Sequence, residues 1–295
     1  MTHYSTIAII YNPNSTGASK SYAQELYENL QRELPDQKSS LLATKHAGHA
    51  EELAYSLADK HTNPLIISSS GDGGYHEVIN GVLRAQSEGA KPTTALLPAG
   101  NANDHHRNLH SSSLIRRITK GESQAIDILT LEGQTKGKRI KRYAHSYIGF
   151  GLTPHVGKEL NKTSLTRLNE ILLVIRSFFK LRPISLWSNG TLKQYDSLVL
   201  SNIDSMAKYL RISTPSSVTD GKFEVTAFMH TNKFLLFLTL VKTILTSSHE
   251  NSQASYFAVK TVTEAILQAD GEIYTFDADS DIVISIRQKA LRSIV

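Results

Sequence analysis

The 295-residue sequence contains no cysteine, so disulfide bonds, thiolate zinc sites and a cysteine nucleophile are excluded. It also lacks a basic region followed by a long apolar stretch at its start, and we therefore expect no signal peptide. The longest apolar run, residues 234–245, is interrupted by Lys242 and is too short to span a bilayer. We expect this run to form a buried helix, with docking to a membrane surface as the alternative.

What the chain does have is an excess of positive charge. Lysine and arginine total 32 and aspartate and glutamate 27, giving a net charge of +5, which favours anionic partners such as nucleotides or lipid surfaces. The densest basic segment, residues 135–142, is predicted to form a solvated β-hairpin turn, with lipid headgroups as an alternative contact. No aromatic residues alternate with these basic ones, so nucleic acid is not an expected partner.

Strand and helix signals alternate in the first part of the chain. Helical periodicity falls in residues 21–34, 49–60 and 75–86, and strand-like runs fall at 6–11, 39–44, 64–70 and 93–100. Such alternation predicts parallel strands, with ligands gathered at their carboxyl ends. We therefore assign residues 1–125 to a parallel α/β domain.

The pattern changes to short β-rich runs separated by Gly, Asn and Asp turns in the rest of the chain. This pattern predicts a second domain over residues 126–295, an antiparallel β-sandwich or barrel. The alternative that the last strand of this domain returns to the first domain is left open. Two helical stretches, 163–181 and 232–245, interrupt it. Because no low-complexity linker separates the halves, we expect them to pack closely with a cleft between them.

Polar loops follow three of the predicted parallel strands. They read NPNSTG (12–17), SGDGG (70–74) and LPAGNANDHHR (97–107). Parallel strands would bring these loops to one edge of the sheet, where small residues and helix N-termini form a cradle for an anion. The chain lacks G-x-x-x-x-G-K-[ST], and it lacks G-x-G-x-x-G after its first strand, so neither a Walker loop nor an ordinary dinucleotide fold is indicated.

These loops resemble the signatures of the diacylglycerol kinase catalytic-domain family. SGDGGYHEVING (70–81) resembles the family's G-G-D-G-T-x-x-E-V-x-N-G, LPAGNAND (97–104) its L-P-x-G-T-x-N-D, and IIYNPNSTG (9–17) its N-P-x-S-G loop. VTDGKFEV (218–225) and ADGEIY (269–274) look like two later D-G elements of the family. The motifs occur in order over nearly the whole chain.

The resemblance implies an ATP-dependent lipid kinase that uses Mg²⁺. Such an enzyme transfers the γ-phosphoryl group to a lipid hydroxyl, of a diacylglycerol or sphingoid type, which it collects at the membrane surface. It implies a cytoplasmic protein with peripheral membrane association, and a homodimer is left open. One alternative is a kinase of NAD, a more distant relation, or of another soluble hydroxyl compound. A second alternative is a nucleotide-binding protein whose catalysis has decayed.

The resemblance also implies roles for individual residues. Asp72 and Asp104 would hold Mg²⁺, since this ion prefers oxygen ligands. Asp270 and Glu272 match the general-base region, and Asp72 is a further candidate for the base. A structural Mg²⁺ site would comprise Ser217, Asp220 and Lys222. The nucleotide would be bound by Asn12, Pro13, Asn14, Ser15, Thr16, Thr44, Gly71, Asp72, Gly73, Gly74, Glu77, Asn80, Gly100, Asn101 and Asn103.

Four departures from the family pattern affect the expected substrate and rate. Gly74 and Asn101 stand where the signatures have threonine, and His105 stands where phenylalanine is usual. Residues 201–217 contain no glycine pair, which bacterial lipid kinases usually carry there. The carboxylates assigned to metal binding and catalysis are all retained.

Overall fold

The computed structural model describes residues 4–15, 17–100, 103–109, 113–151, 154, 182–206, 210–211, 217–236, 239 and 251–294. These residues form two compact units, Met1–Asp127 with Gln288–Val295, and Ile128–Arg287. The predicted helix at 163–181 lies outside the described residues. Of the predicted helix at 232–245, residues 233–236 are helical, and most of the remainder also lies outside.

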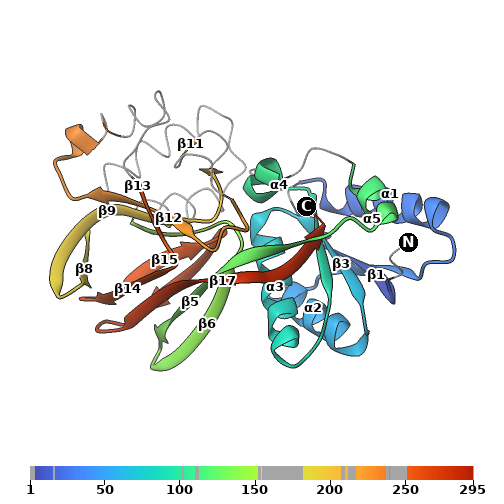
Figure 1. Ribbon diagram of the computed structural model, residues 1–295, viewed down its shortest axis with the longest axis horizontal. Coiled ribbons are helices and arrows are strands. Elements are labelled where there is room, and N and C mark those ends of the chain that lie inside the picture. The colour runs from blue at the N-terminus through green and yellow to red at the C-terminus, as the bar shows by residue number, and fades with distance from the viewer. Residues whose placement is uncertain are drawn as a thin grey trace. The chain divides into compact units, whose positions relative to one another are not determined.

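The first unit is a parallel sheet with helices on its faces (Figure 1). Its strands are ordered β2–β1–β3–β4, and each neighbouring pair is parallel. The strands are β1 (Thr6–Tyr11), β2 (Ser39–Ala43), β3 (Pro64–Ser70) and β4 (Thr93–Pro98). The helices are α1 (Ser19–Glu33), α2 (His49–Lys60), α3 (Asp72–Ser87), α4 (Asp104–Leu109) and α5 (Leu114–Lys120).

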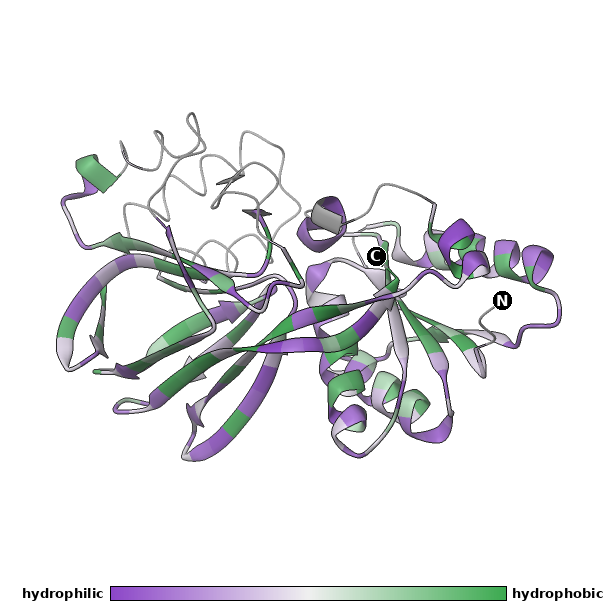
Figure 2. Cartoon of the chain, in the orientation of Figure 1, coloured by the Kyte–Doolittle hydropathy of each residue, from purple (hydrophilic) through white to green (hydrophobic). Residues whose placement is uncertain are grey.

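Helices α1 and α5 cover one face of this sheet. Alternate residues of β1 and β3 point toward them, as the two-residue period of a strand requires. The resulting core contains Ile7, Ile9, Leu65 and Ile67 from the strands and Ala23, Leu26, Leu30 and Ile118 from the helices. Figure 2 shows apolar residues along the strands and polar residues on the outer turns of the helices.

The second unit is built from antiparallel strands. The order β16–β15–β7–β9–β8–β14–β17 runs through it, β12 pairs with β9 and β13, and β5 pairs with β6 and β17. The strands are β5 (Gln124–Thr135), β6 (Lys138–Ala144), β7 (Tyr147–Gly151), β8 (Ile184–Ser188), β9 (Thr191–Ser201), β10 (Ser205–Met206), β11 (Leu210–Arg211), β12 (Phe223–Met229), β13 (Asn251–Ala254), β14 (Tyr256–Thr261), β15 (Ala265–Ala269), β16 (Glu272–Phe276) and β17 (Asp281–Ile294).

The apolar side chains of these strands form a core of their own. Phe150, Phe223 and Phe276 are among its fully buried members. The predicted fold class, a parallel α/β part followed by an antiparallel all-β part, is confirmed. Among the helices that the structure describes, none is long and apolar enough to cross a membrane.

The basic segment 135–142 is the turn and return strand of a β-hairpin, as predicted. Lys136 and Gly137 form the turn between β5 and β6 in left-handed conformations, with φ of 49° and 71°. Glu132 on β5 lies 3.0 Å from both Arg139 and Lys141 on β6. The hydrogen bond from Lys141, followed by the one from Arg139, lowers the pKa of Glu132. Part of the positive charge of this hairpin is therefore compensated within it.

Candidate functional site

Three polar loops of the first unit meet at the carboxyl ends of β1, β3 and β4. Ser19, at the start of α1, exchanges hydrogen bonds with Ser69 of β3 through both hydroxyl groups. The backbone N–H of Ala99 donates to the carbonyl of Ser70 at 2.9 Å. A Cβ atom on Gly17 would overlap the carbonyl oxygen of Ala99, so the first loop also touches the third. The three loops therefore form one site, as the parallel strand order requires.

Gly71 and Gly100 mark the closest approach of the second and third loops. A Cβ atom on Gly71 would lie 3.1 Å from the Cα of Gly100. Asn103 fixes the third loop, because its side chain accepts from the Gly100 N–H at 2.9 Å and donates to the Gly100 carbonyl at 2.8 Å. The glycines of both signatures are thus needed for contact between two backbones.

Asp72 is the first residue of α3 and binds the start of α4. Its half-buried carboxylate accepts from the N–H of Asp104 at 3.0 Å and from that of His105 at 3.2 Å. Asp104, which is 4% exposed, is thereby brought next to Asp72. The structure thus places the Asp72 carboxylate against the backbone of Asp104, the other residue assigned to a metal ion, and carboxylate oxygens are the ligands that Mg²⁺ prefers.

Gly74 leaves room for another side chain of the same signature. A Cβ atom on Gly74 would lie 2.5 Å from Cβ and 2.7 Å from Oγ of Ser70. The hydroxyl of Ser70 lies 2.7 Å from that of Ser68 and donates to the Gly71 carbonyl at 3.0 Å. A hydroxyl is therefore present in this turn, on residue 70 instead of residue 74.

Glu77 and Asn80 have partners that the sequence did not indicate. The carboxylate of Glu77 accepts from the N–H groups of Gly48 at 2.9 Å and Ala50 at 3.1 Å, and so caps the N-terminus of α2. Asn80 is buried and donates to the carbonyl of His76 at 2.8 Å. No local pattern predicts the contact of Glu77, because helix and cap are far apart in sequence.

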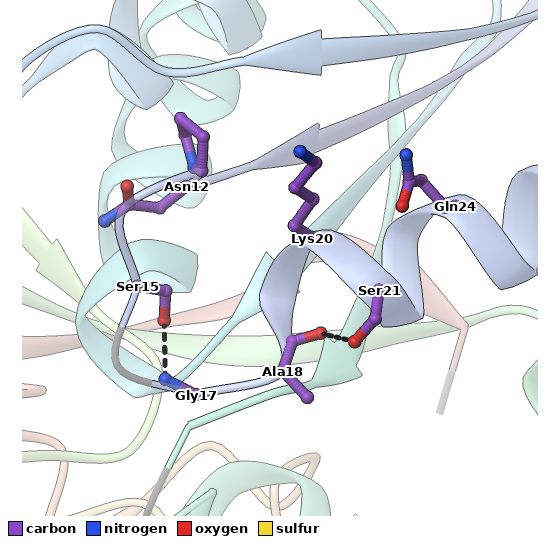
Figure 3. A pocket seen from close by; sticks show the side chains of 8 residues that line it. Asn12, Ser15, Gly17, Ala18, Lys20, Ser21 and Gln24 are labelled. Atoms are coloured by element: carbon purple, nitrogen blue, oxygen red, sulfur yellow. Dashed lines mark hydrogen bonds between the residues drawn. The ribbon is translucent and has the colours of Figure 1, made fainter.

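A small cavity opens beside the first loop (Figure 3). Its volume is about 220 Å³, and it is lined by Asn12, Pro13, Ser15, Gly17, Ala18, Lys20, Ser21 and Gln24. Lys20 and Gln24, one turn apart on α1, extend on the same side of the helix. The first three lining residues were predicted to bind nucleotide, whereas Lys20 was missed. Its signal in the sequence is a cation at the start of the helix that follows the loop.

The remaining loop residues are less informative. Asn14 donates its N–H to the side chain of Asn12 at 2.9 Å, and the N–H of Thr44 donates to the carbonyl of Tyr11 at 2.9 Å. Gly73 is in the first turn of α3. Thr16 and Asn101, which were also predicted to bind nucleotide, lie outside the described residues.

Asp270 and Glu272, both in the second unit, have contrasting environments. Asp270 is fully buried, and its carboxylate accepts from the N–H groups of His145 (2.7 Å), Ser146 (2.9 Å) and Tyr147 (3.0 Å). Nε2 of His145 lies 3.4 Å from the same carboxylate. Glu272, the first residue of β16, is exposed. These donors stabilise the ionised form of Asp270 and bind the β15–β16 turn to the turn before β7.

Ser217, Asp220 and Lys222 lie together in the turn before β12. The N–H of Asp220 donates to the Ser217 carbonyl at 3.3 Å, and the N–H of Lys222 donates to the Asp220 carboxylate at 3.0 Å. All three residues are exposed. The structure therefore groups the residues of the predicted second metal site, in an arrangement that an ordinary hydrogen-bonded turn also has.

One further group of potential metal ligands was not predicted from the sequence. His46, His49 and Glu52 each place a ligand atom within 4.8 Å of the other two. Nδ1 of His49 already accepts the N–H of Lys45 at 3.0 Å, which leaves the hydrogen of a neutral ring on Nε2. His49 would have to give up this bond to ligate an ion.

Comparison with known proteins supports the family resemblance seen in the sequence. Residues 6–131 match the model of the diacylglycerol kinase catalytic domain. A diacylglycerol kinase of Bacillus subtilis is 28% identical over 83% of this chain and 80% of its own length. A diacylglycerol kinase of Staphylococcus aureus is 25% identical over 90% of this chain and 85% of its own length.

Solved structures agree on the fold. A putative diacylglycerol kinase from Bacillus anthracis superimposes with a TM-score of 0.73 at 19% identity, covering 100% of this chain and 98% of its own. A yeast NADH kinase in complex with NADH gives a TM-score of 0.52 at 11% identity, covering 99% of this chain and 83% of its own. The predicted resemblance to this family and the predicted enzyme class are confirmed: residues 6–131 match the diacylglycerol kinase catalytic domain, and the chain is a kinase.

Proposed function

We propose that this kinase transfers the γ-phosphoryl group of ATP to the hydroxyl of a lipid, with Mg²⁺ as its metal ion. The observation that carries the proposal is the position of Asp72. Its half-buried carboxylate lies where the three loops meet, and it is tied to the helix that carries Asp104. Phosphoryl transfer depends on positioning the phosphates and compensating their charge, and both requirements can be met at this place.

The backbone supplies the positive side of the proposed nucleotide site. Helix α3 begins at Asp72 directly after Gly71, and the Gly71 cap contributes no side-chain hydrogen bond. The first N–H groups of a helix attract anions, and the glycines allow phosphates to come close to them. A Mg²⁺ ion held by Asp72 and Asp104 would compensate the remaining phosphate charge when it is bound.

A lipid acceptor is supported by the relatives rather than by any one residue. The curated relatives are named diacylglycerol kinases, and their similarity extends over both units of this chain. A lipid substrate would require the enzyme to associate with a membrane surface. A soluble acceptor is the second candidate, because the yeast NADH kinase shares the fold of this chain. Loss of catalysis is the third candidate, because Gly74 departs from the signature.

The decisive experiment offers several acceptors to one enzyme. Purified protein, labelled ATP and Mg²⁺ are combined with diacylglycerol, phosphatidylglycerol, sphingosine or ceramide in mixed micelles, and separately with NAD. We expect one lipid to be labelled in preference to NAD. Labelled NADP with no lipid product would establish the soluble-acceptor alternative, and no transfer at all would establish a binding protein.

A matched pair of variants connects the activity with the site. Asp72→Asn should lower the rate at least about a hundredfold, because the variant loses the carboxylate that would hold Mg²⁺ beside the phosphates. Asp59→Asn removes the same charge from an exposed position on α2 and should leave the rate unchanged. Retention of full activity by Asp72→Asn would show that the site is assigned wrongly.

A further inference from the structure

Three potential metal ligands gather where the chain enters α2. His49 is the first residue of this helix, Glu52 lies in the same first turn, and His46 belongs to the loop before it. One ligand atom of each residue lies within 4.8 Å of those of the other two, and the centroids of the two imidazole rings are 4.9 Å apart. Two imidazoles and one carboxylate form a ligand set that proteins use for Zn²⁺, with water in the fourth position.

The ring of His46 makes the hydrogen bond that a ligating imidazole usually makes. Its Nδ1 atom lies 3.0 Å from the carbonyl oxygen of Ala47. Because a carbonyl oxygen only accepts, Nδ1 carries the hydrogen of the neutral ring and Nε2 carries the lone pair. A histidine that binds a metal ion usually donates its second ring N–H to such a carbonyl, which fixes the ring. The side chain is exposed, so an ion can reach it from solvent.

Helix α2 holds the other two ligands on one face. Residues three apart on a helix are neighbours, and their side chains lean toward the N-terminus of the helix, where His46 lies. The backbone on both sides of His49 is fixed from α3, because the N–H groups of Gly48 and Ala50 donate to Glu77. The negative charge of Glu77 also offsets the positive end of the helix dipole, which would otherwise oppose a cation.

Binding of an ion would replace one hydrogen bond of His49. Its Nδ1 atom accepts the N–H of Lys45 at 3.0 Å. An ion on Nδ1 takes the place of this N–H, whereas an ion on Nε2 requires the ring hydrogen to move to Nδ1, which releases the N–H. In both cases the bond is lost at the exposed surface, where water can accept from Lys45. The loss is small beside the gain of three bonds to a metal ion.

We propose that His46, His49 and Glu52 bind one divalent transition-metal ion, of which Zn²⁺ fits best. The site shares no residue with the proposed Mg²⁺ site at Asp72 and Asp104, and the inference does not rest on the proposed kinase reaction. Imidazole nitrogen suits Zn²⁺, whereas Mg²⁺ prefers oxygen ligands in a nearly octahedral shell, so this ligand set selects Zn²⁺ against Mg²⁺. The ion would connect the loop before α2 to the first turn of the helix and stabilise this end of α2.

Calorimetry with the metal alone measures the site. Zn²⁺ is titrated into the untagged, full-length protein, which has been treated with EDTA and dialysed, in the absence of nucleotide and lipid. We expect a site for one ion with a Kd of about 10 μM or tighter. Mg²⁺ in about tenfold excess over Zn²⁺ should leave this Kd unchanged, because the two imidazoles are poor ligands for Mg²⁺.

Matched substitutions assign the ligands. E52Q removes the carboxylate of the site, whereas E51Q removes the neighbouring carboxylate of the same turn, whose Oε1 lies 3.6 Å from Nη1 of Arg84. H46A removes one imidazole of the site, and H61A removes an imidazole at the opposite end of α2. We expect the Kd for Zn²⁺ to rise at least about tenfold in E52Q and H46A, and to stay within about twofold in E51Q and H61A.

Thermal unfolding gives a second measurement of the same site. Because the ion binds the folded protein, Zn²⁺ should raise the melting temperature of the wild type and leave that of H46A/H49A unchanged. In EDTA the wild type and this double variant should melt within about 2 °C of each other, since neither histidine belongs to a core cluster.

The inference would be overturned if the wild type bound no Zn²⁺, or if E52Q and H46A bound it as tightly as the wild type. Equal weakening in E51Q and H61A would overturn it too, because general charge around α2 would then hold the ion. Displacement by Mg²⁺ would contradict the assigned imidazole ligands. Since nucleotide and lipid are absent from these measurements, none of the results decides the proposed kinase function.

Discussion

At the scale of single residues, aspartates of similar sequence context have different environments. Asp72 and Asp270 both belong to D-G pairs, yet Asp72 is half-buried at the start of a helix whereas Asp270 is fully enclosed. The convergence of Asp72 and Asp104 could be predicted, because parallel strands bring their loops to one edge. The burial of Asp270 could not, since its donors come from a turn more than a hundred residues earlier in the chain.

Asp270→Asn and Glu272→Gln should separate a structural carboxylate from a catalytic one. Asparagine offers a single acceptor oxygen, and its NH₂ group would face N–H donors, so D270N should lose about 2–4 kcal/mol of unfolding free energy. Exposed Glu272 should tolerate glutamine within about 0.5 kcal/mol. Urea denaturation measures the change in unfolding free energy for both variants. Turnover is then compared per molecule of folded protein.

The activities of the same two variants identify the base. If E272Q remains stable but loses turnover, the general base is Glu272, the carboxylate that solvent reaches. A D270N variant with wild-type stability and no activity would contradict the structural role that its three backbone donors indicate.

At the scale of elements, the turn between β3 and α3 shows how a departure from a signature is accommodated. The family signature G-G-D-G-T has glycine at the position of residue 70 and threonine at that of residue 74, whereas this chain has Ser70 and Gly74. Because the two positions share one space, a side chain at one requires glycine at the other. The sequence showed the loss of a hydroxyl at Gly74, but only the structure relates it to the hydroxyl of Ser70.

A double-mutant cycle tests this exchange. G74T alone should cost about 1–3 kcal/mol of unfolding free energy through overpacking against Ser70. S70G alone should cost about 1 kcal/mol, through the loss of its hydrogen bonds and the added freedom of glycine. The double variant S70G/G74T should be more stable than the sum predicts by at least about 1 kcal/mol. Additive effects would show that the two positions do not compete for space.

The boundaries of helices and strands in the first unit agree closely with the sequence patterns. The contacts between these elements, however, could not be predicted from the patterns. Strand β1 and helix α2 have the ends that composition predicts. The cap that Glu77 provides for α2 was not predictable, since it depends on how α2 and α3 lie in the folded unit. Periodicity reports which face of an element is buried, and it says nothing about which distant group meets the end of that element.

At the scale of the whole molecule, the chain returns to its first unit at the end. The last residues of β17, Ser293 and Ile294, pair in parallel with Thr94 and Ala95 of β4. The side chain of Ile294 is fully buried in the core with Ile7 and Ile9. The stability of the first unit therefore depends on residues far from it in sequence.

Ile294→Ala should accordingly destabilise the first unit by about 2–4 kcal/mol, through lost burial and the cavity left behind. Ile266→Ala is the control, because Ile266 is 38% exposed in the second unit and its truncation should cost less than about 1 kcal/mol.

The chain has one tryptophan, Trp187 on β8, so its fluorescence reports the second unit alone. Helices α1 to α5 all belong to the first unit and contain most of the helical residues that the structure describes, so the helical circular dichroism signal follows mainly this unit. We expect I294A to shift the urea midpoint seen by circular dichroism more than the midpoint seen by fluorescence. Equal shifts in both signals would show instead that the two units unfold as one.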